Sequence, residues 1–183
     1  METWTHPGGK LVDVGPESLT REELLAILIG TGYKGATAED IAKEFFYEFY
    51  SFYGLLGKKP GDLLKIKGLK EGKIARISAA YEITKRIIKE KGWDLPAVRK
   101  ITLGLPALSD AGVLAVLIGS GYNDKTAVGL AEALLDKYGS LFGIAGQRLS
   151  DMAKIKGLGD VKVIRIAAAY EIVAKVVKIL EAE

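Results

Sequence analysis

The chain has 183 residues, of which 49% are hydrophobic and 27% charged, and its formal net charge is +3. This length accommodates one medium-sized domain or two small ones. No apolar run reaches the roughly 18 residues of a membrane span, and the N-terminus lacks the pattern of a secretory signal. The absence of cysteine excludes disulfides, cysteine nucleophiles and thiolate metal sites. We therefore expect a cytoplasmic protein without a membrane partner.

The first half of the chain predicts helices almost throughout. Thr20–Glu23 has the capping-box pattern and opens an apolar segment that stops at Gly30. Thr37 begins a second helix, in which aliphatic and aromatic residues recur at helical spacing. Ser51 is a candidate cap for a short turn that follows.

A helical hairpin is predicted next. Pro60 suits the first position of a short helix, Pro60–Ile66, and Gly68 ends that helix. A long helix with an apolar face is then expected from about Gly72 to Glu90.

The second half repeats these signals after a linker. Residues 92–106 are rich in glycine and proline, and only residues 99–103 hint at a strand. The expected fold class is all-α, with about five helices in each half. The candidate caps of the second half are Ser109, Thr126, Ser140, Ser150 and Asp160.

The two halves are related by an internal repeat. A shift of 89 residues aligns residues 19–90 with residues 108–179 without a gap, and by direct comparison 29 of these 72 positions are identical. Similarity at this level predicts a tandem duplication of one fold. The predicted domains are residues 1–91 and residues 107–183, joined by residues 92–106.

Positive charge is concentrated at one turn of each half. Residues 58–76 contain seven basic and two acidic residues, and residues 154–165 contain four basic residues and one acidic residue. Such clusters at equivalent turns are typical of a surface that faces phosphates. A solvated lysine-rich face is the alternative explanation.

The turns themselves favour an anion site. Gly68 and Gly157 suit a helix C-cap with positive φ, and Leu69 and Leu158 are expected to fold back as the apolar plug of each hairpin. The helix that follows begins with unpaired amides at the positive end of its dipole. The lysines expected around these ends are Lys67, Lys70, Lys73, Lys156 and Lys162.

These residues resemble a known family. A glycine turn followed by a basic helix resembles the helix-hairpin-helix motif of DNA-binding proteins. Three segments, 10–20, 24–32 and 66–82, resemble the N-terminal domain of the bacterial RadC family, and the match covers nearly all of both halves. The implied fold is a tandem pair of SAM-like (RuvA C-terminal-like) domains, each with two hairpins.

The resemblance implies binding of duplex or branched DNA through backbone phosphates, independently of sequence, in DNA repair or maintenance. The turns of the first hairpins would be Gly30 with Gly32 and Gly119 with Gly121. The implied DNA-binding residues are Lys67, Gly68, Lys70, Lys73, Arg76, Lys156, Gly157, Gly159, Lys162 and Arg165.

The sequence departs from the RadC pattern in two ways. The second glycine of the motif is present as Gly159, whereas Lys70 replaces it in the first half, which puts the amide geometry there in question. RadC proteins also continue into a metalloprotease-like domain with paired histidines, whereas His6 is the single histidine of this sequence. The activity of that domain is therefore not expected.

A DNA glycosylase is one alternative function. Hairpin-bearing glycosylases place a lysine in the hairpin and an aspartate about twenty residues later, a spacing that Lys73 and Asp94 share, but the segment around Asp94 does not resemble theirs. We therefore expect no catalytic residue, no enzyme activity, no bound metal and no required cofactor, although turn carbonyls of such hairpins are able to hold a monovalent cation.

The other alternative is a protein-binding adaptor that has lost DNA binding. The alanines at 79–80 and 167–169 would allow close helix packing. Four tyrosines are expected in the core or at an interface rather than on DNA: Tyr33, Tyr81, Tyr122 and Tyr170.

Overall fold

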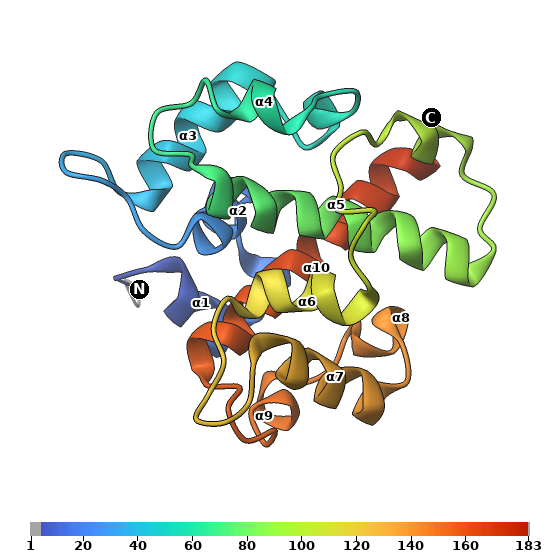
Figure 1. The fold of residues 1–183 in the computed structure, drawn as a ribbon. Helices are drawn as coiled ribbons and strands as arrows, with labels where there is room; N and C mark the ends of the chain where they lie inside the picture. Colours follow the sequence, from blue (N-terminus) through green and yellow to red (C-terminus); the bar gives the residue numbers. More distant parts are fainter. Residues whose placement is uncertain (1–4, 183) are drawn as a thin grey trace.

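The computed structural model describes residues 5–182 (Figure 1). Within this range the chain forms ten α-helices, three 3₁₀ helices and no β-strand, which confirms the all-α class. None of these helices is both long and apolar enough to cross a membrane. The α-helices are α1 (Pro7–Val14), α2 (Arg21–Ile29), α3 (Ala38–Phe49), α4 (Pro60–Leu63), α5 (Glu71–Lys91), α6 (Asp110–Ile118), α7 (Ala127–Tyr138), α8 (Leu141–Ile144), α9 (Leu149–Met152) and α10 (Asp160–Glu181). The 3₁₀ helices are η1 (Pro16–Ser18), η2 (Tyr53–Leu55) and η3 (Pro96–Lys100).

Most of the predicted helix starts are confirmed. Thr20 and Thr37 form capping boxes at α2 and α3. The hydroxyls of Ser109, Thr126 and Ser140 each accept the backbone amide three residues later, at 3.0 to 3.1 Å. Each cap satisfies an amide that the helix geometry leaves without a partner.

Three predicted caps are wrong. Ser51 precedes η2 but does not cap it, since Phe52 is the N-cap residue there. Ser150 lies inside α9, whose N-cap is Arg148. Asp160 is the first residue of α10 rather than its N-cap, so its carboxylate interacts with the helix dipole instead of with a free amide.

Three other predicted elements also differ from the structure. The short helix that begins at Pro60 ends at Leu63 rather than Ile66, because the chain turns there toward the hairpin. The strand hinted at in residues 99–103 does not form, since η3 extends to Lys100 and the next residues run extended without a ladder. The long helix α5 extends one residue beyond each predicted end.

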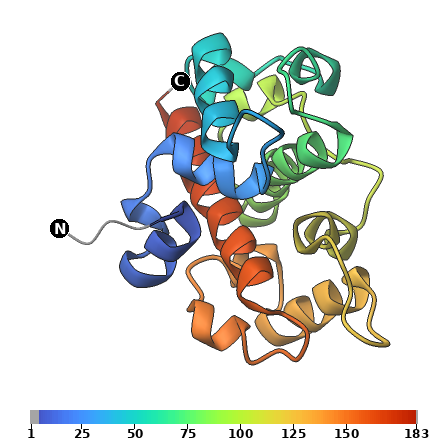
Figure 2. The ribbon, with the colours of Figure 1, turned by 90° about the vertical axis from the view of Figure 1, so that its left-hand side faces the viewer.

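The core is built around the two long helices. α5 and α10 contact each other, and each packs against both α2 and α6. α10 runs through the middle of the molecule in Figure 2. The buried residues of both halves belong to one continuous cluster. In these two helices Ala79, Ala80, Ala168 and Ala169 are fully buried, whereas Ala167 is only partly buried.

The repeated tyrosines of the long helices lie in this core. The Tyr81 hydroxyl donates to the carbonyl of Phe52 at 2.7 Å, and the Tyr170 hydroxyl donates to that of Leu141 at 2.8 Å. Burial raises the pKa of both phenols. Their predicted place in the core is confirmed.

The segment predicted as a linker is packed against the first half. The amide of Gly57 donates to the carbonyl of Lys100 at 2.7 Å. The side chain of Ile101 is 4% exposed and that of Leu103 is fully buried. Residues 100–104 therefore occupy a groove of the fold rather than spanning solvent.

Candidate nucleic-acid interface

Each long helix is preceded by a tight hairpin turn. Gly68 has φ 90° and Gly157 has φ 105°, the left-handed conformation that the sequence predicts for them. Leu69 and Leu158 are 3% and 1% exposed, so both fill the hairpin as expected. The turns thus fix where the chain enters α5 and α10.

The lysine that replaces the second glycine fits its position. Lys70 has φ −110° and ψ 169°, and Gly159 has φ −75° and ψ 170°. Both are ordinary extended conformations, which any residue adopts. The backbone enters the two helices similarly, so the substitution at Lys70 does not disturb the amides that follow.

The starts of α5 and α10 lack side-chain caps. Lys70 and Gly159 are the N-cap residues, and neither accepts an amide through a side chain. Within residues 5–182, every other helix of eight or more residues is capped by a side chain, namely His6, Thr20, Thr37, Ser109 or Thr126. The two uncapped ends present free amides and a positive dipole to solvent.

Exposed lysines surround these two ends. Lys67, Lys70 and Lys156 are exposed. The Lys67 ammonium lies 4.9 Å from the centre of the Tyr33 ring, a cation–π distance that positions this charge beside the turn. These three side chains add positive charge beside the two helix starts.

The predicted lysines inside the long helices have a second task. Lys73 donates its ammonium to the carbonyl of Thr31. Lys162 donates to the carbonyls of Gly121 and Gly157, at 3.0 and 2.9 Å. Burial, and then the charges of neighbouring basic groups, lower the pKa of Lys73. Both lysines hold the turn of the first hairpin against the second.

Arg76 and Arg165 bind helix ends. Arg76 Nη1 donates to the carbonyls of Leu28 and Ile29, at 2.7 and 3.1 Å, where α2 ends. Arg165 Nη1 donates to the corresponding carbonyls at the end of α6, at 2.9 and 3.3 Å. Burial lowers the pKa of both guanidinium groups. The structure therefore gives them a stabilising role, and contact with DNA stays a prediction.

Replacing Arg165 by methionine should test this role. The substitution keeps the apolar stem but leaves two carbonyls at the end of α6 without their donor. We expect it to lower the free energy of unfolding by about 2 kcal/mol. Urea denaturation measures the change, and Arg148→Met, at an exposed position, serves as the control. Equal stability of the two variants would show that the hydrogen bonds of Arg165 to the end of α6 do not stabilise the fold.

The glycines of the first hairpins are required by their surroundings. Gly30 and Gly119 have φ 80° and 81°. A Cβ at Gly32 would overlap the carbonyl oxygen of Ala36, and one at Gly121 would overlap that of Lys125. Hydrogen bonds from Lys73 and Lys162 to carbonyls of these turns hold them next to the starts of the long helices.

Both uncapped ends lie on one side of the molecule. α5 and α10 each begin on the left-hand side of Figure 1, the side that faces the viewer in Figure 2. A cavity of about 480 Å³ lies beside the start of α10 and is lined by Gly30, Thr31, Val161 and Arg165, among others. The candidate interface is this face.

Sequence reasoning missed two features of this face. The sequence did not indicate that Arg76 and Arg165 bind the last carbonyls of α2 and α6. The available signal was that an arginine stands at this position in both repeats without an acidic residue three or four positions away. Tyr122, which was expected in the core or at an interface, is 45% exposed and so lies outside the core, whereas its counterpart Tyr33 packs against the core. Its turn, which contains Asn123 at φ 52°, projects into solvent.

Comparison with known proteins gives a consistent result. The profile of the family described as UPF0758 N-terminal matches residues 1–75 and 80–164. The UPF0758 protein of Aliivibrio salmonicida is 41% identical over 87 residues, which are 48% of this chain and 39% of that protein. That of Coprothermobacter proteolyticus is 41% identical over 85 residues, or 46% and 36%. That of Desulforudis audaxviator is 35% identical over 97 residues, or 52% and 41%.

The match is partial in length. The aligned segment makes up between 36% and 41% of these three relatives. No solved structure matches the chain.

Proposed function

We propose that this chain, which belongs to the RadC-like UPF0758 family through its N-terminal domain, binds DNA through two copies of that domain. The binding is non-sequence-specific and uses backbone phosphates. We place the protein in DNA repair or maintenance and propose that it is not an enzyme.

Recurrent contacts support the two copies. The carbonyls bound by Arg76 and those bound by Arg165 are 89 residues apart, as are the carbonyls bound by Tyr81 and Tyr170. The turn pairing of Tyr33 with Ala36 also recurs 89 residues later. Since non-local contacts repeat with the sequence, a duplicated pair of helix-hairpin-helix domains explains them best.

The uncapped starts of α5 and α10 carry the proposal. A helix whose N-terminus lies in solvent is normally capped there by a side chain. In residues 5–182 the other helices of eight or more residues all have such a cap. A phosphate oxygen would accept the free amides at both ends. Because backbone amides contact phosphate and not base edges, such binding carries no sequence information.

The side chains divide between two tasks. Lys67, Lys70 and Lys156 are exposed and supply charge near the phosphate. Lys73 and Lys162 hold the neighbouring turn in place through its carbonyls. Glu71 and Asp160, in the first turn of each helix, oppose anion binding and limit the affinity of a single site.

Salt dependence should test phosphate binding. If the two hairpins neutralise about four phosphates, log affinity should fall with log salt concentration at a slope of about −3.6. Fluorescence anisotropy with two duplexes of unrelated sequence measures the slope, and both should give the same affinity. The DNA recovered afterwards, with Mg²⁺ present, should be uncut.

Failure of this experiment has a clear meaning. Negligible binding to duplex and branched DNA at low salt would remove the DNA function and leave the adaptor alternative. A strong preference for one duplex sequence would instead contradict binding through the backbone alone.

A further inference from the structure

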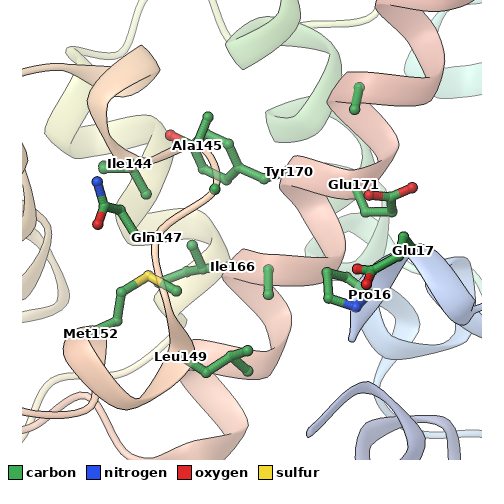
Figure 3. A pocket seen from close by; sticks show the side chains of 13 residues that line it. Pro16, Glu17, Ile144, Ala145, Gln147, Leu149, Met152, Ile166, Tyr170 and Glu171 are labelled. Carbon is green, nitrogen blue, oxygen red and sulfur yellow. The ribbon is translucent and has the colours of Figure 1, made fainter. Parts of the chain in front are cut away.

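A groove beside α10 is open in this structure. Its volume is about 380 Å³, within the range of ligand sites. Figure 3 shows its apolar wall, which includes Ile144, Leu149, Met152 and Ile166, with Tyr170 next to Ala145. Glu171 and Glu17 lie together at one end, the latter beside Pro16 of η1.

The corresponding groove of the first half is filled by the chain itself. Residues 100–104 lie in it: the Gly57 amide binds the carbonyl of Lys100, and the Thr102 hydroxyl donates to the carbonyl of Lys58 at 2.6 Å. The Leu105 amide donates to Glu82 at 3.1 Å. The apolar side chains Ile101 and Leu103 are buried there. This segment shows how an extended chain binds such a groove.

The same positions of the second half retain their binding groups. Gly146, Gln147 and Glu171 are the residues 89 positions after Gly57, Lys58 and Glu82, and all three line the open groove. The Gly146 amide makes no hydrogen bond within the described part of the chain. The groups that hold residues 100–104 in one groove are thus present in the other, where none of them binds an extended segment of the described chain.

The segment of this chain that corresponds to residues 100–104 lies elsewhere. Residues 11–15 align with it, but they belong largely to α1, where Leu11 is fully buried. Val12 and Val14 are 55% and 47% exposed there, whereas their counterparts Ile101 and Leu103 are buried in the filled groove. The open groove is therefore available to another chain.

The two grooves differ in charge at one end. Glu82 binds Arg86 at 2.9 Å and Lys85 at 3.3 Å, and Arg86 also binds Asp110 at 2.7 Å, so two bases balance two carboxylates there. Among residues 5–182, Glu171 has one basic partner, Lys175, at 3.2 Å, and Glu17 adds a second carboxylate beside it. The surplus negative charge favours a basic group on whatever binds there.

We propose that this groove binds an extended segment of a partner protein with the pattern apolar-x-apolar-Gly followed by a basic residue. Its backbone carbonyl would accept the Gly146 amide, as Lys100 does at Gly57. Its two apolar side chains would occupy the places that Ile101 and Leu103 have in the other groove. This inference does not depend on the proposed DNA binding.

The segment 11–15 of this chain is a poorer occupant than a partner. At the place of Thr102 it has Asp13, whose ionised carboxylate has no proton to donate to the carbonyl of Gln147. It would also bring a third carboxylate close to Glu17 and Glu171. Charge and hydrogen bonding therefore both favour a chain with a hydroxyl and a basic residue.

A synthetic peptide tests the proposal. The probe is the acetylated and amidated hexapeptide Lys-Ile-Thr-Leu-Gly-Lys, added to isotope-labelled full-length protein. We expect saturable changes in amide chemical shifts, largest at Gly146, Gln147 and Glu171. A peptide with Asp in place of Leu should bind about tenfold more weakly or worse, because a buried leucine is lost. A peptide ending in Glu should also lose about tenfold.

Variants of the protein provide the controls. Ala174→Trp fills the groove from an exposed position and should abolish the shifts, whereas Lys178→Trp, one turn further along α10, should not. Binding that survives Ala174→Trp, or that ignores the Leu-to-Asp change, would overturn the proposal. Chemical shifts typical of an extended backbone at residues 11–15 in the free protein would also overturn it, because they would show that the chain fills its own groove.

Discussion

Replacing both Lys70 and Lys156 by glutamate is expected to weaken binding to duplex DNA by about 100-fold at low salt. Two attractions beside the polyanion become repulsions, and the slope of log affinity against log salt should flatten by about 1.8. Both side chains are exposed and form no ion pair within the described residues, so folding should be unaffected. Anisotropy titrations in several salt concentrations measure both effects.

The long helices offer a matched control. Lys89→Glu with Lys178→Glu makes the same charge change at exposed positions near the opposite ends of α5 and α10. At about 0.1 M salt its effect on affinity should be several times smaller than that of the first double variant, because the Debye length there is only about 10 Å. Equal losses in the two double variants would mean that net charge alone governs binding. Lys162 is unsuitable for this test, since its charge also holds the Gly121 turn.

Gly157→Val should destabilise the second hairpin strongly. The backbone there has φ 105°, and a Cβ would lie 2.8 Å from Leu130 Cδ2 and 2.9 Å from Tyr122 Cβ. Backbone strain and overpacking each cost about 1 to 3 kcal/mol, so we expect the free energy of unfolding to fall by about 3 kcal/mol or more. Thermal or urea denaturation followed by circular dichroism measures it.

Gly159→Ala provides the comparison two residues later. That glycine has φ −75°, and a Cβ there would meet no atom within 4 Å. The expected change in stability is below about 0.5 kcal/mol. If both substitutions were tolerated, the left-handed turn at Gly157 would not be a requirement of the fold.

Local features of the fold could be predicted from the sequence. Capping at Thr20, Thr37, Ser109 and Thr126 depends on residues within one helical turn, so pattern alone identifies it. The positive φ of Gly68 and Gly157 is also a local property, since a glycine at the end of a helix commonly adopts it. The predicted caps Ser150 and Asp160 are wrong because they lie in the first turn of their helices. Serine and aspartate are common there as well as at the N-cap, so the residue type alone does not fix the position.

Contacts between distant segments could not be predicted. Lys73 and Arg76 are indistinguishable from surface cations in the sequence, yet each binds carbonyls more than 40 residues away. The burial of Ile101 and Leu103 could not be predicted either, since glycine and proline in residues 92–106 indicate a loop but not the surface on which it packs. Such pairings require the folded arrangement of both elements.

The crosswise packing of the long helices makes unfolding a collective event. α10 covers α2 as well as α6, and α5 covers α6 as well as α2, so opening either half uncovers apolar surface of the other. Amides in the middle of α5 and α10 therefore exchange with solvent only when the whole molecule opens. Two sequence repeats then behave as one thermodynamic unit, with a single transition and a heat capacity change set by their combined buried surface.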